Sequence, residues 1–338
     1  MKKAITIYLI IFTLLNLLGL TVFNSQPDFH GLVVRTLPFT KVSDRLIRDT
    51  ENNLHLKQSD NSLAMRKTAY AVVATYSMMP SDVKLIAAPM LSKNLPGTTF
   101  RTDNYDTNES IDLLIKIMKD YQFNVLDYRE YLDDEADIKN LFYKNSSLPL
   151  TKTCFWEFQQ FVSYYKTEFG VDLDPEGYYT NPANYIIQTY TNAYLGEFTE
   201  EIGRYYHGVD DYTVIYPNFE TSYQIDNGET RVGDFVSVLM NLEKLNDPKT
   251  MVDSYMFPIG NPSVIVNHTT KNNERIYIIT DNSTSPYIAF LTTLFKEVHL
   301  VDVNNIPKNS ADYIKTHNID NVLLALTNQV AYFDDIVK

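Results

Sequence analysis

Short apolar runs alternate with amphipathic segments over most of this chain. The run at residues 83–89 (VKLIAAP) is continuous and ends at a proline, as a strand buried on both faces does. Residues 108–120 carry apolar side chains at helical spacing, and the run at 124–128 (NVLDY) predicts a second strand. The C-terminal third repeats the pattern, with strands expected at 275–280, 298–303 and 321–327 and helices at 285–297 and 310–317. This order predicts right-handed crossovers and a parallel sheet covered by helices on both faces.

The middle of the chain departs from this alternation. Residues 153–170 predict a long helix with an aromatic stripe, ended by Gly170. Residues 192–254 are rich in turn formers and tyrosine, which favours a hairpin insertion over another strand–helix unit. The expected fold class is therefore α/β, a sandwich around a parallel sheet with a Tyr-rich hairpin insertion.

The N-terminus has the pattern of a membrane anchor. Residues 4–23 contain no charged residue and follow Lys2 and Lys3. At about 1.5 Å per residue, such a helix spans the hydrocarbon core of a bilayer. The two lysines favour a cytoplasmic N-terminus. A cleaved signal peptide is the alternative, but no small-residue cleavage site follows the apolar run. We expect a signal anchor at 1–23, a linker at 24–62 and an extracytoplasmic domain at 63–338 of a cell-membrane protein.

Composition excludes several classes of function. The 338 residues contain 29 Lys and Arg against 42 Asp and Glu, a net charge of −13, so nucleic acid is not an expected partner. The single cysteine, Cys154, forms neither an internal disulfide nor a thiolate metal site. No glycine-rich phosphate loop is present either. We therefore expect no cofactor and no metal.

One loop has the composition of a reactive site. Residues 280–285 (TDNSTS) lie between the predicted strand at 275–280 and the next helix, where parallel sheets bind ligands. Free N–H groups at the start of that helix favour an anion or a developing oxyanion. The loop is either a nucleophile loop or a helix cap, because Ser, Thr and Asp also occur there for capping alone.

The order of elements resembles a known family. The C-terminal block RIYIITDNSTSPYIAFLTTLFKEVHLVDVNN, followed by DYIKTHNIDNVLLAL, is similar to that of the DHHW proteins. These are SGNH-hydrolase-like relatives of the alginate O-acetyltransferases. Upstream, AYLGEFTEEIGRYYHGVDDYTVIYPNFETSY, VKLIAAPMLSKNLPG and FNVLDYREYL resemble further family segments, so the similarity spans about residues 80 to 327. The resemblance implies an SGNH-like three-layer sandwich, export, and a role in acylating or deacylating cell-surface polysaccharide.

The residues at the family's catalytic positions differ here. Asp281 matches the family aspartate, but Asn282 stands where the nucleophilic serine is expected, and Ser283 comes one position later. Ser146 and Ser147 follow the Phe-Tyr-Lys run that should precede the Asp-His-His-Trp motif. At the third site, Asn261 is followed by proline in place of histidine. An amide is no acyl-transfer nucleophile, and a serine without a positioned base reacts slowly, so the resemblance implies a pseudoenzyme.

A pseudoenzyme of this type acts by binding, either to cell-surface polysaccharide or to a membrane-bound O-acyltransferase. Aromatic rings stack on sugar faces, so the candidate glycan contacts are Tyr143, Trp156, Tyr205, Tyr206 and, beside them, His207. Further tyrosines of the same kind are Tyr164, Tyr178 and Tyr179. Two alternatives remain open: an active O-acyltransferase or esterase that uses Ser283 or Ser146 with another base, and a structural envelope protein.

Overall fold

The structure of the protein, a computed structural model, describes residues 27–36, 42–57, 62–76, 79, 82–93, 109–132, 140–226, 230–255, 259 and 262–327. The expected anchor at 1–23 lies outside these residues. Within them, no helix combines the length and the apolar character needed to cross a bilayer.

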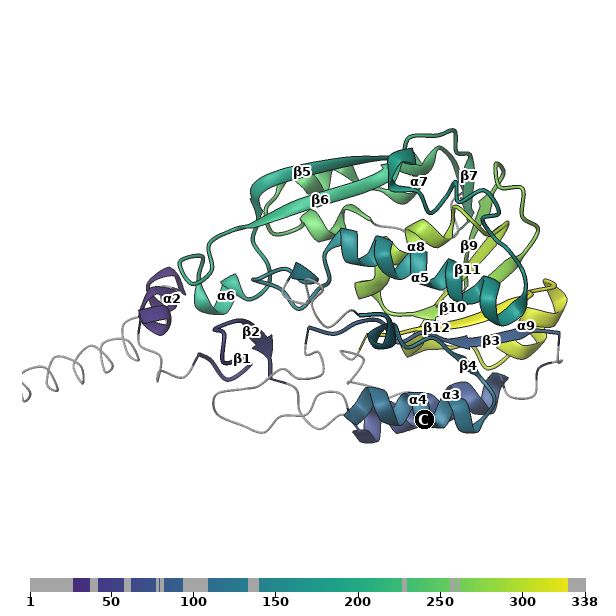
Figure 1. Cartoon of the computed structure of the whole chain (residues 1–338), viewed down its shortest axis with the longest axis horizontal. Helices are drawn as coiled ribbons and strands as arrows, with labels where there is room; N and C mark the ends of the chain where they lie inside the picture. Colours follow the sequence, from purple (N-terminus) through teal and green to yellow (C-terminus); the bar gives the residue numbers. More distant parts are fainter. Residues whose placement is uncertain are drawn as a thin grey trace, which may run out of the picture.

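An eight-stranded sheet forms the middle layer, with the strand order β4-β3-β12-β10-β11-β9-β7-β8 (Figure 1). The five strands from β4 to β11 are parallel, and β9, β7 and β8 extend the sheet antiparallel to their neighbours. The bounds are β3 Lys84–Ala87, β4 Asn124–Val125, β7 Tyr223–Asp226, β8 Thr230–Gly233, β9 Ser263–Asn267, β10 Arg275–Thr280, β11 Glu297–Asp302 and β12 Asn321–Ala325. The five predicted strands are thus confirmed as parallel. The prediction that the whole sheet is parallel was wrong, because β9, β7 and β8 are antiparallel to their neighbours. Short connections such as the one between β7 and β8 allow only antiparallel pairing.

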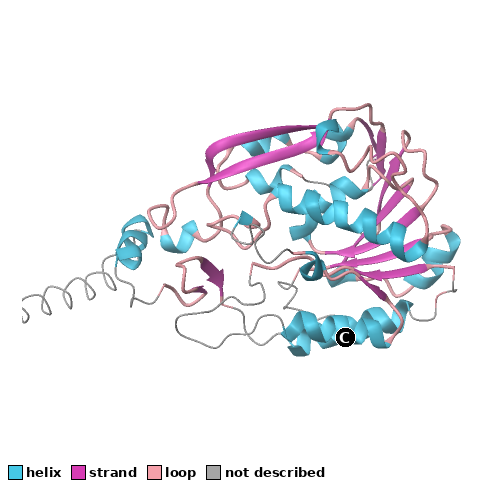
Figure 2. Ribbon diagram, viewed as in Figure 1, coloured by secondary structure: helices cyan, strands magenta, loops and turns pink. Residues whose placement is uncertain are grey.

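Alternate side chains of the central strands face two separate cores. Ile276 and Ile278 of β10 pack toward helices α5 and α8, whereas Tyr277 and Ile279 pack toward α3, α4 and α9. Figure 2 shows helices on both sides of the sheet. The helices are α3 Ser62–Tyr76, α4 Glu109–Asp120, α5 Thr151–Phe169, α8 Ser285–Leu291 and α9 Ser310–Thr316. This arrangement is a three-layer α/β sandwich.

Two helix ends show how the local sequence sets the boundaries. Helix α5 ends at Gly170, which adopts φ 66° and donates its N–H to the Lys166 carbonyl, as the glycine predicted. Helix α8 ends at Leu291, earlier than the expected residue 297. The hydroxyls of Thr292 and Thr293 bond to carbonyls three residues back, and this bonding competes with continuation of the helix.

The Tyr-rich hairpin lies over α5 on the side away from the sheet (Figure 1). It consists of β5 Tyr185–Tyr194 and β6 Asp210–Pro217, antiparallel, with the short helix α6 Thr199–Ile202 in the connection between them. The hairpin begins earlier than the predicted residue 192. The rest of the expected insertion, β7 and β8, belongs to the main sheet.

Part of the expected linker at 24–62 has regular structure. Helix α2 Pro27–Thr36 and strands β1 Leu46–Arg48 and β2 Leu54–Leu56 pack with α6 around a small core. Its members are Val34, Val42, Leu46, Leu54, Phe198, Ile202 and Tyr206. This unit therefore lies against the connection between β5 and β6.

Candidate functional site

Asp281 joins the end of β10 to the end of β12. Its Oδ1 accepts a hydrogen bond from the Ser283 N–H at 2.8 Å. Its Oδ2 accepts bonds from both the N–H and the hydroxyl of Thr327, each at 2.9 Å. Asp281 also caps the 3₁₀ turn η7 Asn282–Thr284, so the carboxylate has the capping role that the sequence left open.

Ser283 follows in the same turn, at the carboxyl edge of the parallel strands. Its side chain is partly buried, and its hydroxyl has no hydrogen-bond partner in the described part of the chain. The Asn282 side chain and the whole of Asn261 lie outside the described residues. Of the predicted site residues in this region, the structure therefore brings together Asp281 and Ser283.

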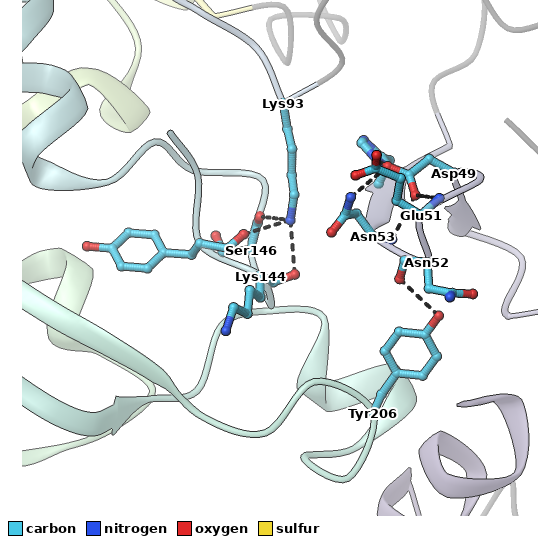
Figure 3. A network of polar contacts seen from close by, with 10 residues as sticks. Asp49, Glu51, Asn52, Asn53, Lys93, Lys144, Ser146 and Tyr206 are labelled. Atoms are coloured by element: carbon cyan, nitrogen blue, oxygen red, sulfur yellow. Dashed lines mark hydrogen bonds and ion pairs between the residues drawn. The ribbon is translucent and has the colours of Figure 1, made fainter. Parts of the chain in front are cut away.

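Residues 142–149, here called the Ser146 hairpin, form a tight turn closed by a bridge between Phe142 and Pro149. The hairpin lies around the terminal amino group of Lys93, a residue of the segment that follows β3 (Figure 3). Lys93 donates to three of its carbonyl oxygens, those of Tyr143 (2.6 Å), Lys144 (2.9 Å) and Ser146 (2.9 Å). A charged donor shared by three carbonyls fixes the shape of the hairpin.

Asp210, the first residue of β6, also holds this hairpin. Its Oδ1 accepts from the Lys144 N–H (3.1 Å), and its Oδ2 accepts from the N–H and side-chain amide of Asn145 (2.9 and 3.1 Å). The Asn145 amide also donates to the Gly208 carbonyl at 3.0 Å. The connection between β5 and β6 is thereby attached to the Ser146 hairpin.

The two serines of the hairpin have structural partners. Ser146 is fully buried, and its hydroxyl oxygen accepts the Leu148 N–H at 3.1 Å. Ser147 donates both its N–H and its hydroxyl to the Glu197 carboxylate, at 2.8 and 2.7 Å. A hydroxyl has one proton, so the Ser147 hydroxyl does not donate to a histidine at the same time.

His207 is the histidine on the connection that contacts the hairpin. Its Nε2 is buried without a hydrogen-bond partner in the described structure. Burial, together with the positive charges of Lys93 and Lys144, lowers the pKa of His207 to about 4. The ring is therefore neutral at pH 7, but a base with so low a pKa accepts a proton from a serine poorly.

A second polar group lies across from Lys93 in Figure 3 and is centred on Asp49. Asp49 Oδ1 accepts the N–H groups of Glu51 and Asn53 at 2.8 Å each, and Oδ2 lies 3.1 Å from His55 Nε2. Burial lowers the pKa of Lys93 to about 7, although the carboxylates of Asp210, Glu197 and Asp49 oppose that fall. The group around Lys93 thus combines a half-buried amine that titrates near neutral pH with several carboxylates.

Sequence reasoning missed this polar group. A signal existed for Lys93, because it follows the predicted strand at 83–89 at the edge where ligands bind. The sequence contained no such signal for Asp49 and His55. They lie in a segment that has no clear hydrophobic period and was expected to be a linker.

The candidate glycan contacts differ widely in exposure. Tyr143 and Tyr206 are buried, and Tyr143 packs edge-on against Tyr194 with ring centroids 4.8 Å apart. Trp156 is partly buried beside Tyr128. Tyr205 is 49% exposed, with the Arg204 guanidinium 5.4 Å from its ring centroid. Among the five predicted contacts, Tyr205 presents the largest accessible ring.

The fold matches two solved structures over almost their whole length. PatB1 of Bacillus cereus, solved with a sulfonyl adduct, aligns with a TM-score of 0.64 at 14% identity, covering 84% of this chain and 94% of PatB1. A DHHW family protein from Eubacterium siraeum aligns with a TM-score of 0.63 at 13% identity, covering 86% and 92%. This chain has the SGNH-like fold of the DHHW proteins. The predicted resemblance is therefore confirmed in the fold. No family model matches the sequence, and no curated protein matches it at a significant level.

Proposed function

We propose that this DHHW-type protein serves cell-surface polysaccharide O-acylation by binding rather than by catalysis. Its ligand is either the polysaccharide or a membrane-bound O-acyltransferase. In this proposal residues 1–23 anchor the chain in the cell membrane, and the folded part lies outside the cytoplasm. The support is the SGNH-like fold together with the partners of the polar residues at the family's catalytic positions.

The observation that carries the proposal is that, among the described residues, no histidine hydrogen-bonds to Ser283 or Ser146. In a serine–histidine–aspartate site, the carboxylate orients a histidine that takes the serine proton. Here Asp281 accepts hydrogen bonds from Ser283 N–H and from Thr327 on its two oxygens. All six histidines lie within the described residues, and none of them hydrogen-bonds to Ser283 or Ser146. The absence of a histidine base beside these serines in the described part of the chain supports a binding function.

The second candidate is an active O-acyltransferase or esterase, and one observation favours it. Among the described residues the Ser283 hydroxyl makes no hydrogen bond, and it lies at the carboxyl edge, where sheets of this class bind ligands. Ser146 has less support, because its oxygen is buried and already accepts the Leu148 N–H.

An esterase assay separates the two functions. The full chain is incubated with 4-nitrophenyl acetate, an activated acetyl ester, beside the variants Ser283→Ala and Ser146→Ala. We expect all three proteins to hydrolyse the ester at the same background rate, and a fluorophosphonate probe to leave them unlabelled. Turnover that disappears in Ser283→Ala would show that the enzyme function is correct.

Binding is tested separately. The full chain is sedimented with insoluble cell-wall polysaccharide, and membrane extracts are examined for a co-purifying O-acyltransferase. We expect at least one of these associations to occur. If neither occurs, the structural-envelope alternative is favoured.

A further inference from the structure

A cavity of about 260 Å³ lies at the end of the sheet opposite to Asp281. It is lined by Tyr178, Tyr179, Phe219, Glu220, Thr221, Tyr223, Asn267, Thr269 and Thr293. Tyr223 begins β7 and pairs with Asn267, whose N–H bonds to the residue before β11. The cavity is therefore at the amino ends of the parallel strands. The six residues of β10 put about 20 Å between the two ends of the sheet.

One wall of the cavity is a continuous aromatic surface. The ring centroid of Phe219 is 5.1 Å from that of Tyr178 and 5.7 Å from that of Tyr179, and the two tyrosine centroids are 5.5 Å apart. Tyr178 is 42% exposed, so part of this surface is open to a ligand. Aromatic rings of this kind contact the apolar faces of sugars.

The wall is held in place from behind by Asp174, which is 7% exposed. Its Oδ1 accepts the N–H groups of Tyr178 and Tyr179, at 2.7 and 3.1 Å. Its Oδ2 accepts the N–H and the hydroxyl of Thr180, both at 2.8 Å. The backbone that carries the two rings is therefore fixed before any ligand binds, which lowers the entropy cost of binding.

The polar lining combines a buried, unpaired hydroxyl with an exposed carboxylate. Tyr223 is fully buried, and its hydroxyl has no hydrogen-bond partner among the described residues. Burial raises its pKa, so the phenol stays protonated and can both donate and accept. Glu220 is exposed next to Phe219 and offers a carboxylate acceptor. Asn267 is not available, because its side chain already bonds Thr269 and the Thr292 carbonyl.

We propose that this cavity binds one pyranose ring of a neutral glycan. The ring would stack on Tyr178 and Phe219, and its hydroxyls would bond to Glu220. The inference rests on the proposed function and adds a second place of contact far from the family's catalytic edge. The cavity is smaller than the about 300–1,000 Å³ of pockets for drug-sized ligands, which suits a single sugar ring. The Glu220 carboxylate and the net charge of −13 disfavour acidic sugars.

Calorimetric titration of the full chain with three trisaccharides tests this site. The probes are cellotriose, chitotriose and trigalacturonate. We expect at least one neutral trisaccharide to bind, and trigalacturonate to bind at least about tenfold more weakly, a difference of about 1.4 kcal/mol. Tyr178→Ala should weaken neutral binding about tenfold, whereas Tyr178→Phe keeps the ring and should bind as the native chain does. Tyr70→Ala is the matched control, because this 47%-exposed tyrosine lies on α3, on the other face of the sheet, and Tyr205→Ala tests the alternative contact on the connection between β5 and β6.

The outcomes separate this site from the proposed function. If the native chain binds a neutral trisaccharide and Tyr178→Ala binds it equally well, the site is wrong and glycan binding stands. If Tyr205→Ala alone loses binding, the site is likewise wrong and glycan contacts lie near the Ser146 hairpin. If neither neutral trisaccharide binds, the cavity is no neutral-sugar site, and the sedimentation experiment alone decides polysaccharide binding.

Glu220→Gln tests the role of the carboxylate. This surface change leaves the fold intact and should narrow the difference in affinity between the neutral and acidic trisaccharides. An unchanged difference in affinity contradicts the role of this carboxylate.

Discussion

The ammonium of Lys93 donates a hydrogen bond to the Ser146 carbonyl at 2.9 Å, across 53 residues of sequence. Two more carbonyls of the same hairpin accept from this ammonium. In this way a lysine beyond the carboxyl edge of β3 determines the shape of the segment that stands where the resembling family has its Asp-His-His-Trp motif. The hairpin is thus held by the amino group of Lys93, and residues 142–149 contain no histidine.

Lys93→Met should destabilise the protein by about 2–3 kcal/mol, because it leaves three carbonyls without their charged donor. The free energy of unfolding is measured by urea denaturation. Lys144→Met is the matched control, since the Lys144 side chain is exposed on the same hairpin and should change stability by less than about 0.5 kcal/mol. Equal stability of the two variants would contradict the role of Lys93.

Glu157 gives the fold a pH dependence. This α5 residue is fully buried, its Oε1 accepts the Leu91 N–H at 2.9 Å, and its Oε2 has no partner among the described residues. Burial raises the pKa of Glu157 from 4.5 to about 8. Between these values the folded chain holds a proton that the unfolded chain releases. The protonated Glu157 therefore contributes its full stabilisation to the folded chain below about pH 4.5. This contribution is lost as the pH rises toward 8.

Glu157→Gln removes this titration and keeps an acceptor for Leu91. The free energy of unfolding of both proteins is measured at pH 5 and pH 8. We expect the native chain to lose stability relative to Glu157→Gln as the pH rises. The effects of all other titrating groups are the same in both proteins, so they cancel in the difference between the two free energies of unfolding. A difference that is independent of pH would mean that Glu157 is ionised in the folded state.

The sequence was sufficient to predict the parallel half of the sheet. Runs such as RIYIIT at 275–280 are apolar on both faces, because residues such as Ile276 and Tyr277 contact two different cores, and such runs are easily recognised. Strand β9 was missed because its buried and half-buried positions alternate over only five residues. So short a run is not distinguished from a loop by its pattern.

The candidate site was predictable only in part. Asp281 stands directly after an obvious strand, so its place at the carboxyl edge followed from the pattern. Its bonds to Thr327 did not, since they depend on how β12 ends beside β10. The contacts of Lys93 and Asp210 with the Ser146 hairpin join segments far apart in the sequence, and no local period encodes such pairs.

Gly196 is expected to tolerate no side chain. A Cβ at this position would overlap the Asn145 carbonyl, which belongs to the Ser146 hairpin. Gly196→Ala should therefore displace the hairpin and cost about 1–3 kcal/mol of stability, measured by urea denaturation. A Gly196→Ala variant as stable as the native chain would show that the hairpin moves freely.

The hydrogen bonds from Thr327 to Asp281 predict that this aspartate stabilises the fold. Asp281→Ala removes three hydrogen bonds, and Thr327→Val removes the hydroxyl bond while leaving the N–H. A double-mutant cycle on the free energy of unfolding should give a coupling of about 0.5–3 kcal/mol between the two residues, because they share one contact. An aspartate that served a histidine instead would show no coupling to Thr327, and its loss would lower ester turnover at nearly constant stability. We expect coupling in stability and no change in the background rate with 4-nitrophenyl acetate.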